Sequence, residues 1–246
     1  MQIKGSKILI TGGSSGVGKA TATLLRSLDA DVMIVGKDKD KLEKVGNAIG
    51  AISVAADISE QESIDRIFEV IKHQWDGKLN CLVNNAAVGE FCKLEEVTLE
   101  AFERVFRVNV FGTAMITQKA VEIFRKQQSG NIITIGGSAA VDGFPTGTVY
   151  AASKAAVRNM TQTWRKELRG SNIRVTLINP SEMTTGFPSP QDSNYPPQGV
   201  KNRPERPSEP TKLRGEEVAH LIRSILEVDD RGFVPELNLW ATNPSN

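Results

Sequence analysis

Cysteine and histidine are scarce in this chain of 246 residues, which holds two of each. Cys81 and Cys92 are too few to build the disulfide framework on which small secreted proteins depend. His73 and His220 are too few and too far apart in the sequence for a zinc site, so no metal is expected. Both shortages argue against a disulfide-stabilised secreted protein and against a zinc enzyme.

A charge imbalance and long apolar runs are also missing. The 30 basic and 29 acidic side chains leave a formal net charge of +1, which argues against nucleic acid or an anionic membrane as a partner. No apolar run approaches the ~18 residues needed to cross a bilayer. The first residues, MQIKGSKILITGG, lack the apolar core of a signal peptide. We therefore expect a cytoplasmic protein that binds neither nucleic acid nor membrane.

Short β-branched runs alternate with longer amphipathic segments along the chain. Strands are expected at 7–11, 31–36, 51–57, 80–86, 131–137, 173–180 and 232–240. Helices are expected at 18–28, 39–48, 59–74, 98–128, 149–169 and 215–228. Near-continuous apolar strands separated by helices predict an α/β fold, a doubly wound seven-stranded parallel sheet with helices on both faces. No domain boundary is visible, so residues 1–246 are expected to form a single domain with its ligand at the carboxyl ends of the strands.

One proline-rich segment departs from this rhythm. Residues 187–214 hold seven of the eleven prolines together with many charges. A solvated surface loop is one interpretation of this composition. Because the segment directly follows the sixth expected strand, we favour a substrate lid at 184–214.

The sequence TGGSSGVGKAT joins the first strand to the first helix. Gly12, Gly16 and Gly18 stand in a G-x3-G-x-G arrangement, which allows a tight turn and a close approach of backbone N–H groups to a pyrophosphate. From Gly13 onward the sequence nearly matches a nucleoside-triphosphate loop, but Ala20 stands where a hydroxyl would hold Mg²⁺. A dinucleotide site is therefore favoured over an NTPase, and over a glycine turn without a ligand.

Tyr150 and Lys154 lie four residues apart at an expected helix start, so their side chains share one helix face. A free phenol has a pKa of about 10, and a nearby ammonium favours the phenolate and lowers that pKa. Ser138 follows the fifth strand, where its hydroxyl could bind a carbonyl oxygen and stabilise the negative charge created by hydride transfer. Together the three side chains predict a hydride-transfer site.

These motifs together resemble the short-chain dehydrogenase/reductases, in their shorter form, along essentially the whole chain. The matching residues are Thr11 and Gly12 through Gly18, NNAA at 84–87, VNVFG at 108–112, Ser138, and YAASK at 150–154. Ala87 and Ser181 stand where the family usually has glycine, and both put a Cβ where backbone normally runs close to the cofactor. The ending ELNLWATNPSN lacks the glycine-rich tail common in the acyl-carrier-protein reductases of the family.

The resemblance implies a role for each matched catalytic side chain. Tyr150 would be the general acid in reduction or the base in oxidation, and Lys154 would lower its pKa and bind the nicotinamide ribose. Ser138 would hold the substrate carbonyl. Asn109, in the middle helix, would anchor a water that links Lys154 to solvent.

The resemblance also implies a set of nicotinamide-cofactor contacts. Besides Tyr150 and Lys154, they are Gly12, Ser14, Ser15, Gly16, Val17, Gly18, Lys37, Asp57, Ile58, Asn85, Ala86 and Met183. Asn85 and Ala86 would line the ribose and nicotinamide side of the cofactor. Asp57 would approach the adenine, although it could instead cap the helix expected at 59–74.

The end of the second strand bears on which nicotinamide is used. No carboxylate stands at Gly36, and Lys37 falls where related NADPH-dependent members carry a base. Asp38 and Ser15 weaken this signal, and the lysines of the segment could simply form a solvated helix start. We expect NADP(H) rather than NAD(H).

The substrate pocket is expected to be mostly apolar. Candidate lining residues are Val88, Phe91, Ala140, Phe144, Met183 and Phe187. Of these, Phe144 and Phe187 are expected to contact substrate together with Ser138 and Tyr150. A small to medium hydrophobic ketone, aldehyde or secondary alcohol would fit, and Glu90 and Glu182 could add selectivity for a cationic or hydroxylated group.

The helices expected at 98–128 and 149–169 carry large apolar residues, among them Phe102, Phe106, Phe111 and Trp164. The resemblance suggests that their outer faces pair across a two-fold axis, giving a homotetramer or a dimer. One further functional class stays open, a non-catalytic nicotinamide-binding sensor or scaffold of the same fold. The intact set of Asn109, Ser138, Tyr150 and Lys154 argues against it.

Overall fold

Seven parallel strands form one sheet in the computed structural model, which describes residues 1–184, 187 and 212–242. The strands are β1 (Lys7–Thr11), β2 (Asp31–Gly36), β3 (Ile52–Ala55), β4 (Cys81–Asn84), β5 (Gly130–Ile135), β6 (Ile173–Pro180) and β7 (Glu236–Leu239). Their order across the sheet is β3-β2-β1-β4-β5-β6-β7. From β1 the strands are added first on one side (β2, β3) and then on the other (β4 to β7). This switch beside β1 leaves a crevice at the carboxyl ends of β1 and β4. The predicted doubly wound fold is confirmed.

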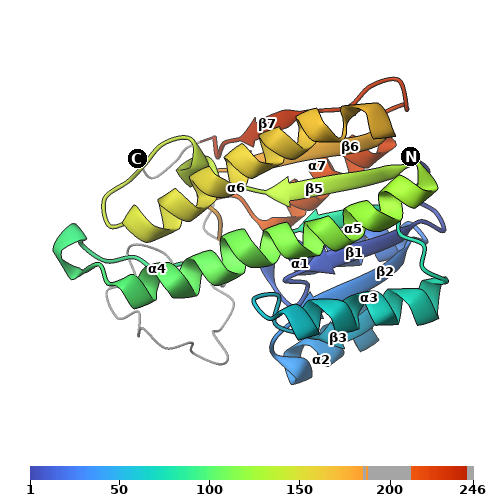
Figure 1. The fold of residues 1–246 in the computed structure, drawn as a ribbon, viewed down its shortest axis with the longest axis horizontal. Helices are drawn as coiled ribbons and strands as arrows, with labels where there is room; N and C mark the ends of the chain where they lie inside the picture. Colours follow the sequence, from blue (N-terminus) through green and yellow to red (C-terminus); the bar gives the residue numbers. More distant parts are fainter. Residues whose placement is uncertain (185–186, 188–211, 243–246) are drawn as a thin grey trace.

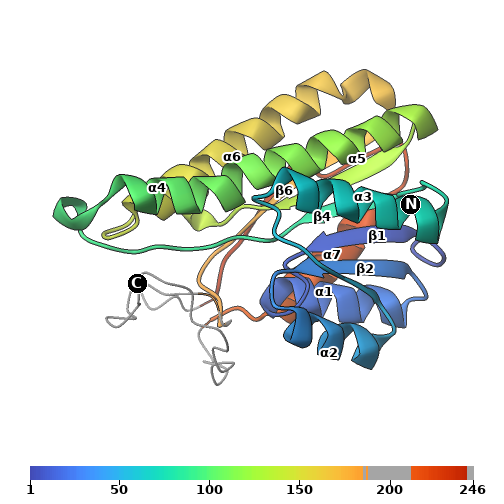
Figure 2. The same ribbon diagram turned by 60° about the horizontal axis from the view of Figure 1, so that its bottom comes forward.

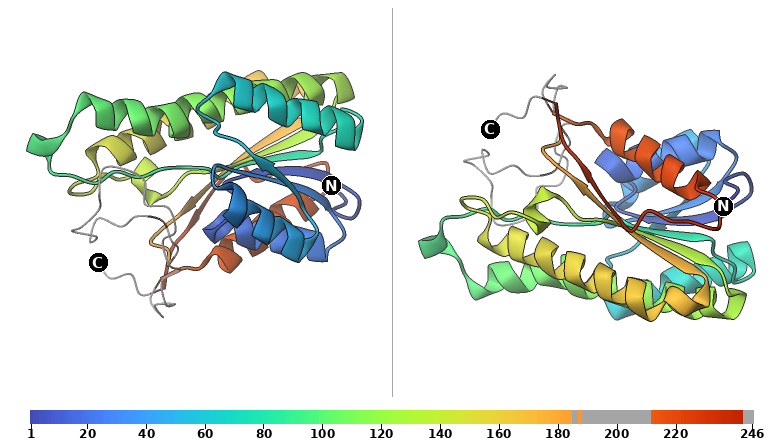
Figure 3. Two further views of the ribbon diagram at one scale, coloured as in Figure 1. Left: turned by 90° about the horizontal axis from the view of Figure 1, so that it is seen from below. Right: turned by 90° about the horizontal axis from the view of Figure 1, so that it is seen from above.

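Helices cover both faces of the sheet. They are α1 (Gly16–Ser27), α2 (Lys39–Ile49), α3 (Gln61–Trp75), α4 (Leu99–Phe106), α5 (Thr113–Gln127), α6 (Thr148–Glu167) and α7 (Gly215–Glu227). Ile8 and Ile10 pack toward α1, α2 and α7, whereas Leu9 between them packs toward α3 and α5. Figure 3 shows the sheet edge-on between the two helical layers. Burial on both faces explains why the strands read as continuous apolar runs.

The helix predicted over 98–128 contains a segment of different winding. After α4 the chain makes a π-helical segment (Arg107–Gly112), and α5 then continues almost in line with α4 (Figure 1). Asn109 lies in this segment and is 1% exposed. A Cβ on Gly112 would stand 2.6 Å from the Ile58 carbonyl oxygen, so close packing here requires glycine. The prediction of helical backbone over this range is confirmed from Leu99 to Gln127, but the π winding was not predicted because a wider turn leaves no mark on the 3.6-residue period.

The ends of several predicted strands also moved, and β3 and β4 each end two residues earlier than predicted. β5 stops at Ile135 because Gly136 and Gly137 leave the sheet, the latter with φ +144°. A Cβ on Gly136 would lie 2.2 Å from Asn179 Oδ1, so this turn depends on the missing side chain. β7 begins at Glu236 rather than at 232.

The turn after β5 leads into α6, which lies beside α4 and α5 on the same face of the sheet (Figure 2). The predicted lid at 184–214 falls almost entirely outside the described residues. Within the described ranges, no helix combines the length and the apolar composition needed to cross a bilayer.

Candidate active site

The carboxyl ends of β1 and β4 are joined through one hydroxyl. Thr11, the last residue of β1, is 1% exposed, and its Oγ1 accepts hydrogen bonds from the N–H groups of Asn85 and Ala86, both at 3.0 Å. The Asn85 side chain also bonds back to the end of β1, because its Nδ2 donates to the carbonyl oxygens of Thr11 at 2.9 Å and of Gly12 at 3.2 Å. Asn85 and Ala86 are thereby fixed beside the glycine loop, and their contact with the cofactor stays a prediction.

The glycine loop fits against this junction only without side chains. Gly12 has φ +67° and Gly16 has φ +50°, in the left-handed region. A Cβ on Gly12 would meet Asn85 Nδ2 at 2.8 Å, and one on Gly18 would meet the Gly12 carbonyl oxygen at 2.2 Å. The three glycines of the motif therefore each have a steric reason to be glycine.

The start of α1 leaves its backbone donors available to a ligand. Ser15 is the N-cap residue, but its side chain makes no capping hydrogen bond, and the first turn carries no acidic residue. Unpaired N–H groups and the positive end of the helix dipole attract an anion. Together with the bare glycine backbone, this turn, which carries the predicted Ser14, Gly16 and Val17, fits the pyrophosphate of a dinucleotide.

Lys37 and Asp57 meet beyond the ends of β2 and β3. Lys37 Nζ lies 2.7 Å from Asp57 Oδ2, and the other carboxylate oxygen accepts hydrogen bonds from Ser59 N at 3.0 Å and Ser59 Oγ at 2.8 Å. Partial burial alone would raise the pKa of Asp57, but the hydrogen bonds from Lys37 and Ser59 outweigh it and lower that pKa. The N-cap position of α3 is Glu60, whose side chain makes no capping hydrogen bond, so the alternative in which Asp57 is the helix N-cap was wrong.

Tyr150 and Lys154 lie in the first two turns of α6, close to the turn that carries Ser138. Lys154 is 4% exposed, its Nζ donates to the Ile135 carbonyl oxygen at 3.0 Å, and it stands 5.7 Å from the centre of the Tyr150 ring. The Tyr150 hydroxyl comes within 4.0 Å of the point where a Cβ on Gly137 would sit. Ser138 follows Gly137, and its hydroxyl has no hydrogen-bond partner among the described residues. The structure therefore brings the three predicted side chains to one place.

The side chain of Asn109 joins three segments around Tyr150. Asn109 Oδ1 accepts from Val88 N at 2.8 Å, while Nδ2 donates to the Val88 carbonyl oxygen at 2.9 Å and to Ser153 Oγ at 3.0 Å. Ser153 Oγ in turn donates to the Tyr150 carbonyl oxygen at 2.7 Å. Both amide hydrogens are thus used within the protein, which supports a positioning role for Asn109. The anchored water stays a prediction.

Comparison with known proteins decides the family. Residues 6–195 match the family model described as short chain dehydrogenase. This chain belongs to the short-chain dehydrogenase family. It is an oxidoreductase of the NAD(P)-dependent dehydrogenase/reductase class.

Two curated relatives and one solved structure illustrate the similarity. A 3-oxoacyl-(acyl-carrier-protein) reductase of Thermotoga maritima is 33% identical over 190 residues, which cover 75% of this chain and 77% of the relative. An oxidoreductase of Sarocladium schorii is 33% identical over 186 residues, or 75% and 74% of the two chains. The crystal structure of a Brucella melitensis 3-ketoacyl-(acyl-carrier-protein) reductase complexed with NADH superposes with a TM-score of 0.85 at 28% identity, covering 98% of each chain.

In this short-chain dehydrogenase the pKa of Tyr150 shifts in the opposite direction to the one expected from the sequence. Desolvation by the surrounding protein raises the pKa of Tyr150 above its ordinary value, opposite to the predicted lowering by Lys154. The reason is geometric, because the Lys154 ammonium is directed at the Ile135 carbonyl oxygen rather than at the phenol. Burial also lowers the pKa of Lys154 from 10.5 to about 8.

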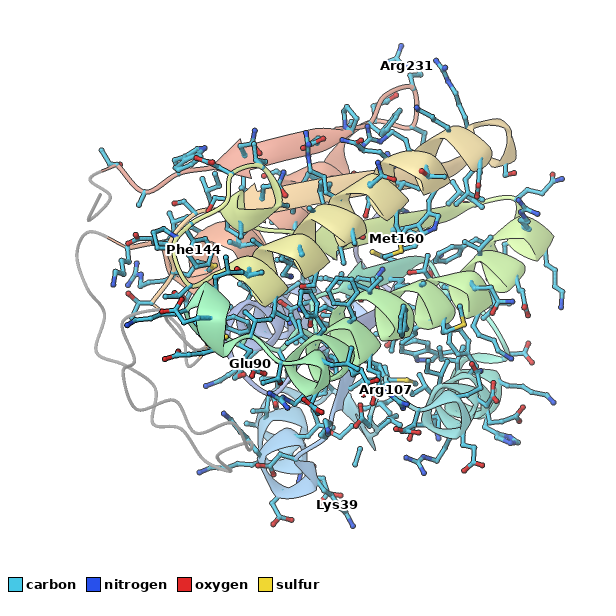
Figure 4. The ribbon with its side chains drawn as sticks, turned by 60° about the vertical axis from the view of Figure 1, so that its left-hand side comes forward. Lys39, Glu90, Arg107, Phe144, Met160 and Arg231 are labelled. Atoms are coloured by element: carbon cyan, nitrogen blue, oxygen red, sulfur yellow. The ribbon has the colours of Figure 1, made fainter. Side chains whose placement is uncertain are left out.

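The predicted apolar substrate residues gather beside Tyr150. The Tyr150 ring lies 5.3 Å from the Phe91 ring and 5.5 Å from the Phe187 ring, and Phe91 lies 5.9 Å from Phe144, measured between centroids. Figure 4 shows Phe144 and Glu90 at the end of the molecule where α6 begins. Glu90 is not an isolated exposed charge, because it is paired with Arg104.

Two further predicted contact residues, Met183 and Ile58, pack against the core on opposite faces of the sheet. Met183 forms a parallel bridge with Leu213 and packs against the core beside α1 and α7. Ile58 is 5% exposed and packs in the core on the opposite face of the sheet.

The two departures from the family pattern are accommodated without strain. Neither Ala87 nor Ser181 has a positive φ. Ser181 Oγ instead accepts from Ala241 N at 2.9 Å, and Ser181 N donates to the Leu239 carbonyl oxygen at 2.8 Å. The hydroxyl thereby ties the end of β6 to the segment after β7.

Two residues that hold the site in place were not predicted from the sequence. Asn179, 1% exposed in β6, accepts from Gly137 N at 3.3 Å and holds the turn next to Ser138. Ser153 links Asn109 to the backbone of Tyr150. The available signal for Asn179 was a polar side chain directly after the apolar pair Leu177 and Ile178 at the end of β6, whereas Ser153 looked like an ordinary small helix residue.

The lowered pKa of Lys154 predicts a pH dependence of stability. The folded protein releases this proton at a pKa of about 8, whereas the unfolded chain holds it to 10.5. Between these values the unfolded state binds more protons, so the free energy of unfolding rises with pH. At about 1.4 kcal/mol per pKa unit, the gain is on the order of 2 kcal/mol by pH 10.

Urea unfolding from pH 7 to pH 10 measures this effect in the wild type and in Lys154→Met, which is expected to lose the rise. Lys166→Met removes an exposed lysine of the same helix and is expected to keep it. Equal pH slopes in the wild type and in Lys154→Met would contradict the assignment.

Proposed function

We propose that this protein transfers a hydride between NADP(H) and a small to medium hydrophobic ketone or aldehyde, or the matching secondary alcohol, with Tyr150 as general acid or base. The observation that carries the proposal is that Tyr150, Lys154 and Ser138 lie close together at the carboxyl end of β5, with no partner for the Ser138 hydroxyl within residues 1–184, 187 and 212–242. That end faces the same crevice as the glycine loop.

The cofactor would be held by groups whose placement suits its parts. The start of α1 would bind the pyrophosphate, Asp57 would lie toward the adenine, and Asn85 and Ala86 would border the nicotinamide side. The Brucella reductase, solved with NADH, supports the nicotinamide class of cofactor. When bound, the reduced cofactor supplies the hydride that the carbonyl carbon receives.

The side chains of the site suit reduction of a carbonyl. The raised pKa of Tyr150 keeps its phenol protonated near neutral pH, so it has a proton to donate to the carbonyl oxygen. Ser138 would donate a hydrogen bond to the same oxygen and oppose its developing negative charge. Lys154, with a pKa of about 8, carries a positive charge at neutral pH; although it donates its hydrogen bond to Ile135, its charge lies 5.7 Å from the centre of the Tyr150 ring and would favour the phenolate left behind.

Lys37 supports NADP(H) over NAD(H). Its side chain is 68% exposed and stands beyond the end of β2, where a 2′-phosphate would approach. Asp57 holds it there at 2.7 Å, so a phosphate would find an oriented cation rather than a freely moving one. Gly36 contributes no carboxylate that would repel the phosphate.

A homo-oligomer, either a dimer or a tetramer, is part of the proposal. Phe111 and Met115 are 58% and 41% exposed, on the outer side of the π-helical segment and α5. Apolar side chains exposed together favour association. The cytoplasmic location stays a prediction from composition.

Tyr150→Phe tests the general acid. The change removes one hydroxyl and keeps the ring, so NADPH oxidation with a ketone panel is expected to fall about 10²–10⁴-fold, the usual contribution of a positioned acid. NADPH binding, followed by the change in cofactor fluorescence, is expected to persist and serves as the control for folding. A variant that retains most of its activity would contradict the role of Tyr150. Tight NADPH binding by a wild type that reduces no carbonyl would favour a sensor.

Lys37→Glu tests the cofactor preference. A carboxylate in place of the ammonium would repel a 2′-phosphate and accept a hydrogen bond from a free ribose hydroxyl. We expect the ratio of kcat/KM for NADPH to that for NADH to fall at least tenfold. Lys39→Glu is the matched control, since Lys39 is equally exposed but pairs along α2 with Glu43. If both variants leave the ratio unchanged, Lys37 does not select the cofactor.

A further inference from the structure

Two of the nine phenylalanines contact Tyr150 and a third contacts one of these two, and each of the three comes from a different segment. Phe91 follows β4, Phe144 precedes α6, and Phe187 follows β6. The rings run in the order Phe144, Phe91, Tyr150, Phe187, with neighbouring centroids 5.3–5.9 Å apart. We call these four residues the aromatic cluster. All four are half-buried, so their rings remain partly accessible.

Two of these rings are held together by their backbones. Cys92 N, next to Phe91, donates to the carbonyl oxygen of Thr146 at 3.1 Å, which ties the segment after β4 to the loop before α6. Thr146 itself has φ +67°, a conformation that a β-branched residue adopts at an energetic cost. The two loops therefore present Phe91 and Phe144 as a preorganised pair rather than as independent side chains.

Gly89 lets the third ring join. A Cβ at this position would lie 2.9 Å from Phe187 Cε1 and 3.1 Å from Phe91 Cε2, inside normal contact distance of both rings. Gly89 does not have a positive φ, so the requirement for glycine comes from the rings and not from the backbone. The missing side chain allows Phe91 and Phe187 to approach Tyr150 from two directions.

The geometry between the rings is the one that aromatic groups prefer. Phe91 meets Tyr150 edge to face, with an interplanar angle of 63°, and Phe187 meets it tilted at 48°. Such contacts favour an aromatic partner over an aliphatic one of the same size by about 2–10-fold in affinity per pair. Glu90 adds no unpaired charge beside these rings, because its carboxylate is paired with Arg104.

From this cluster we propose that the substrate carries an aromatic ring next to its carbonyl or carbinol carbon, and that Phe91, Phe144 and Phe187 determine this specificity. The inference rests on the proposed function, because a carbonyl oxygen within reach of the Tyr150 hydroxyl places its substituents against these rings. A flat ring gains edge and face contacts there that a flexible acyl chain or a saturated ring does not. The substrate class is therefore aryl ketones and aldehydes and the corresponding benzylic alcohols.

Acetophenone and cyclohexyl methyl ketone are a matched pair of probes, because they share a carbon count and differ in aromaticity. Calorimetric titration of each into the protein with NADP⁺ present measures binding without turnover, since both the ketone and the cofactor are oxidised. We expect acetophenone to bind at least fivefold more tightly. Phe91→Leu is expected to reduce this preference to within about twofold, and Phe144→Leu provides a second variant if the first does not fold.

Gly89→Ala adds one methyl group between Phe91 and Phe187 and is expected to weaken acetophenone binding most. Gly143→Ala is its control, because nothing lies within 4 Å of a Cβ at that position on the nearby loop. The inference is overturned if the two ketones bind equally well or if neither ketone binds. It is also overturned if folded Phe91→Leu and Phe144→Leu keep the preference for acetophenone. Selective acetophenone binding without NADPH-dependent reduction would uphold the aromatic site and count against the proposed function instead.

Discussion

The site depends on how one buried amide is satisfied. Asn109 has almost no contact with solvent, so its donors and acceptor must find partners in the protein. It finds them on the backbone of Val88 and on Ser153, which in turn holds the backbone of Tyr150. The segment after β4, the π-helical turn and the first turns of α6 are thereby fixed to one another. The position of the phenol follows from these bonds.

The site also requires that its segments leave the sheet at the same edge, the one formed by the carboxyl ends of the strands. β1, β4, β5 and β6 run parallel, so the glycine loop, Asn85, Ser138 and Ser181 all emerge on one side. Desolvation at that edge raises the pKa of Tyr150 and lowers that of Lys154. The two pKa shifts share one cause, and they agree with the proposed role of Tyr150 as an acid whose proton must be replaced after each turnover.

Local patterns in the sequence predicted most of this arrangement. Apolar periodicity located the seven strands, and the loop at Gly12–Gly18 and the spacing of Tyr150 and Lys154 predicted the site residues that the fold brings together. What could not be predicted arises from contacts between distant segments. The π-helical turn depends on the packing of Gly112 against Ile58, and the direction of the Tyr150 pKa depends on burial that no spacing rule contains.

Isotope transfer tests the central claim, hydride exchange between a nicotinamide and a carbonyl, most directly. Wild-type protein is given acetophenone with NADPH deuterated at either face of nicotinamide C4, and the alcohol formed is analysed by mass spectrometry. The account predicts one deuterium at the carbinol carbon from one of the two labelled cofactors and none from the other. An alcohol without deuterium from either cofactor, or no alcohol from this or any other ketone tried, would contradict it.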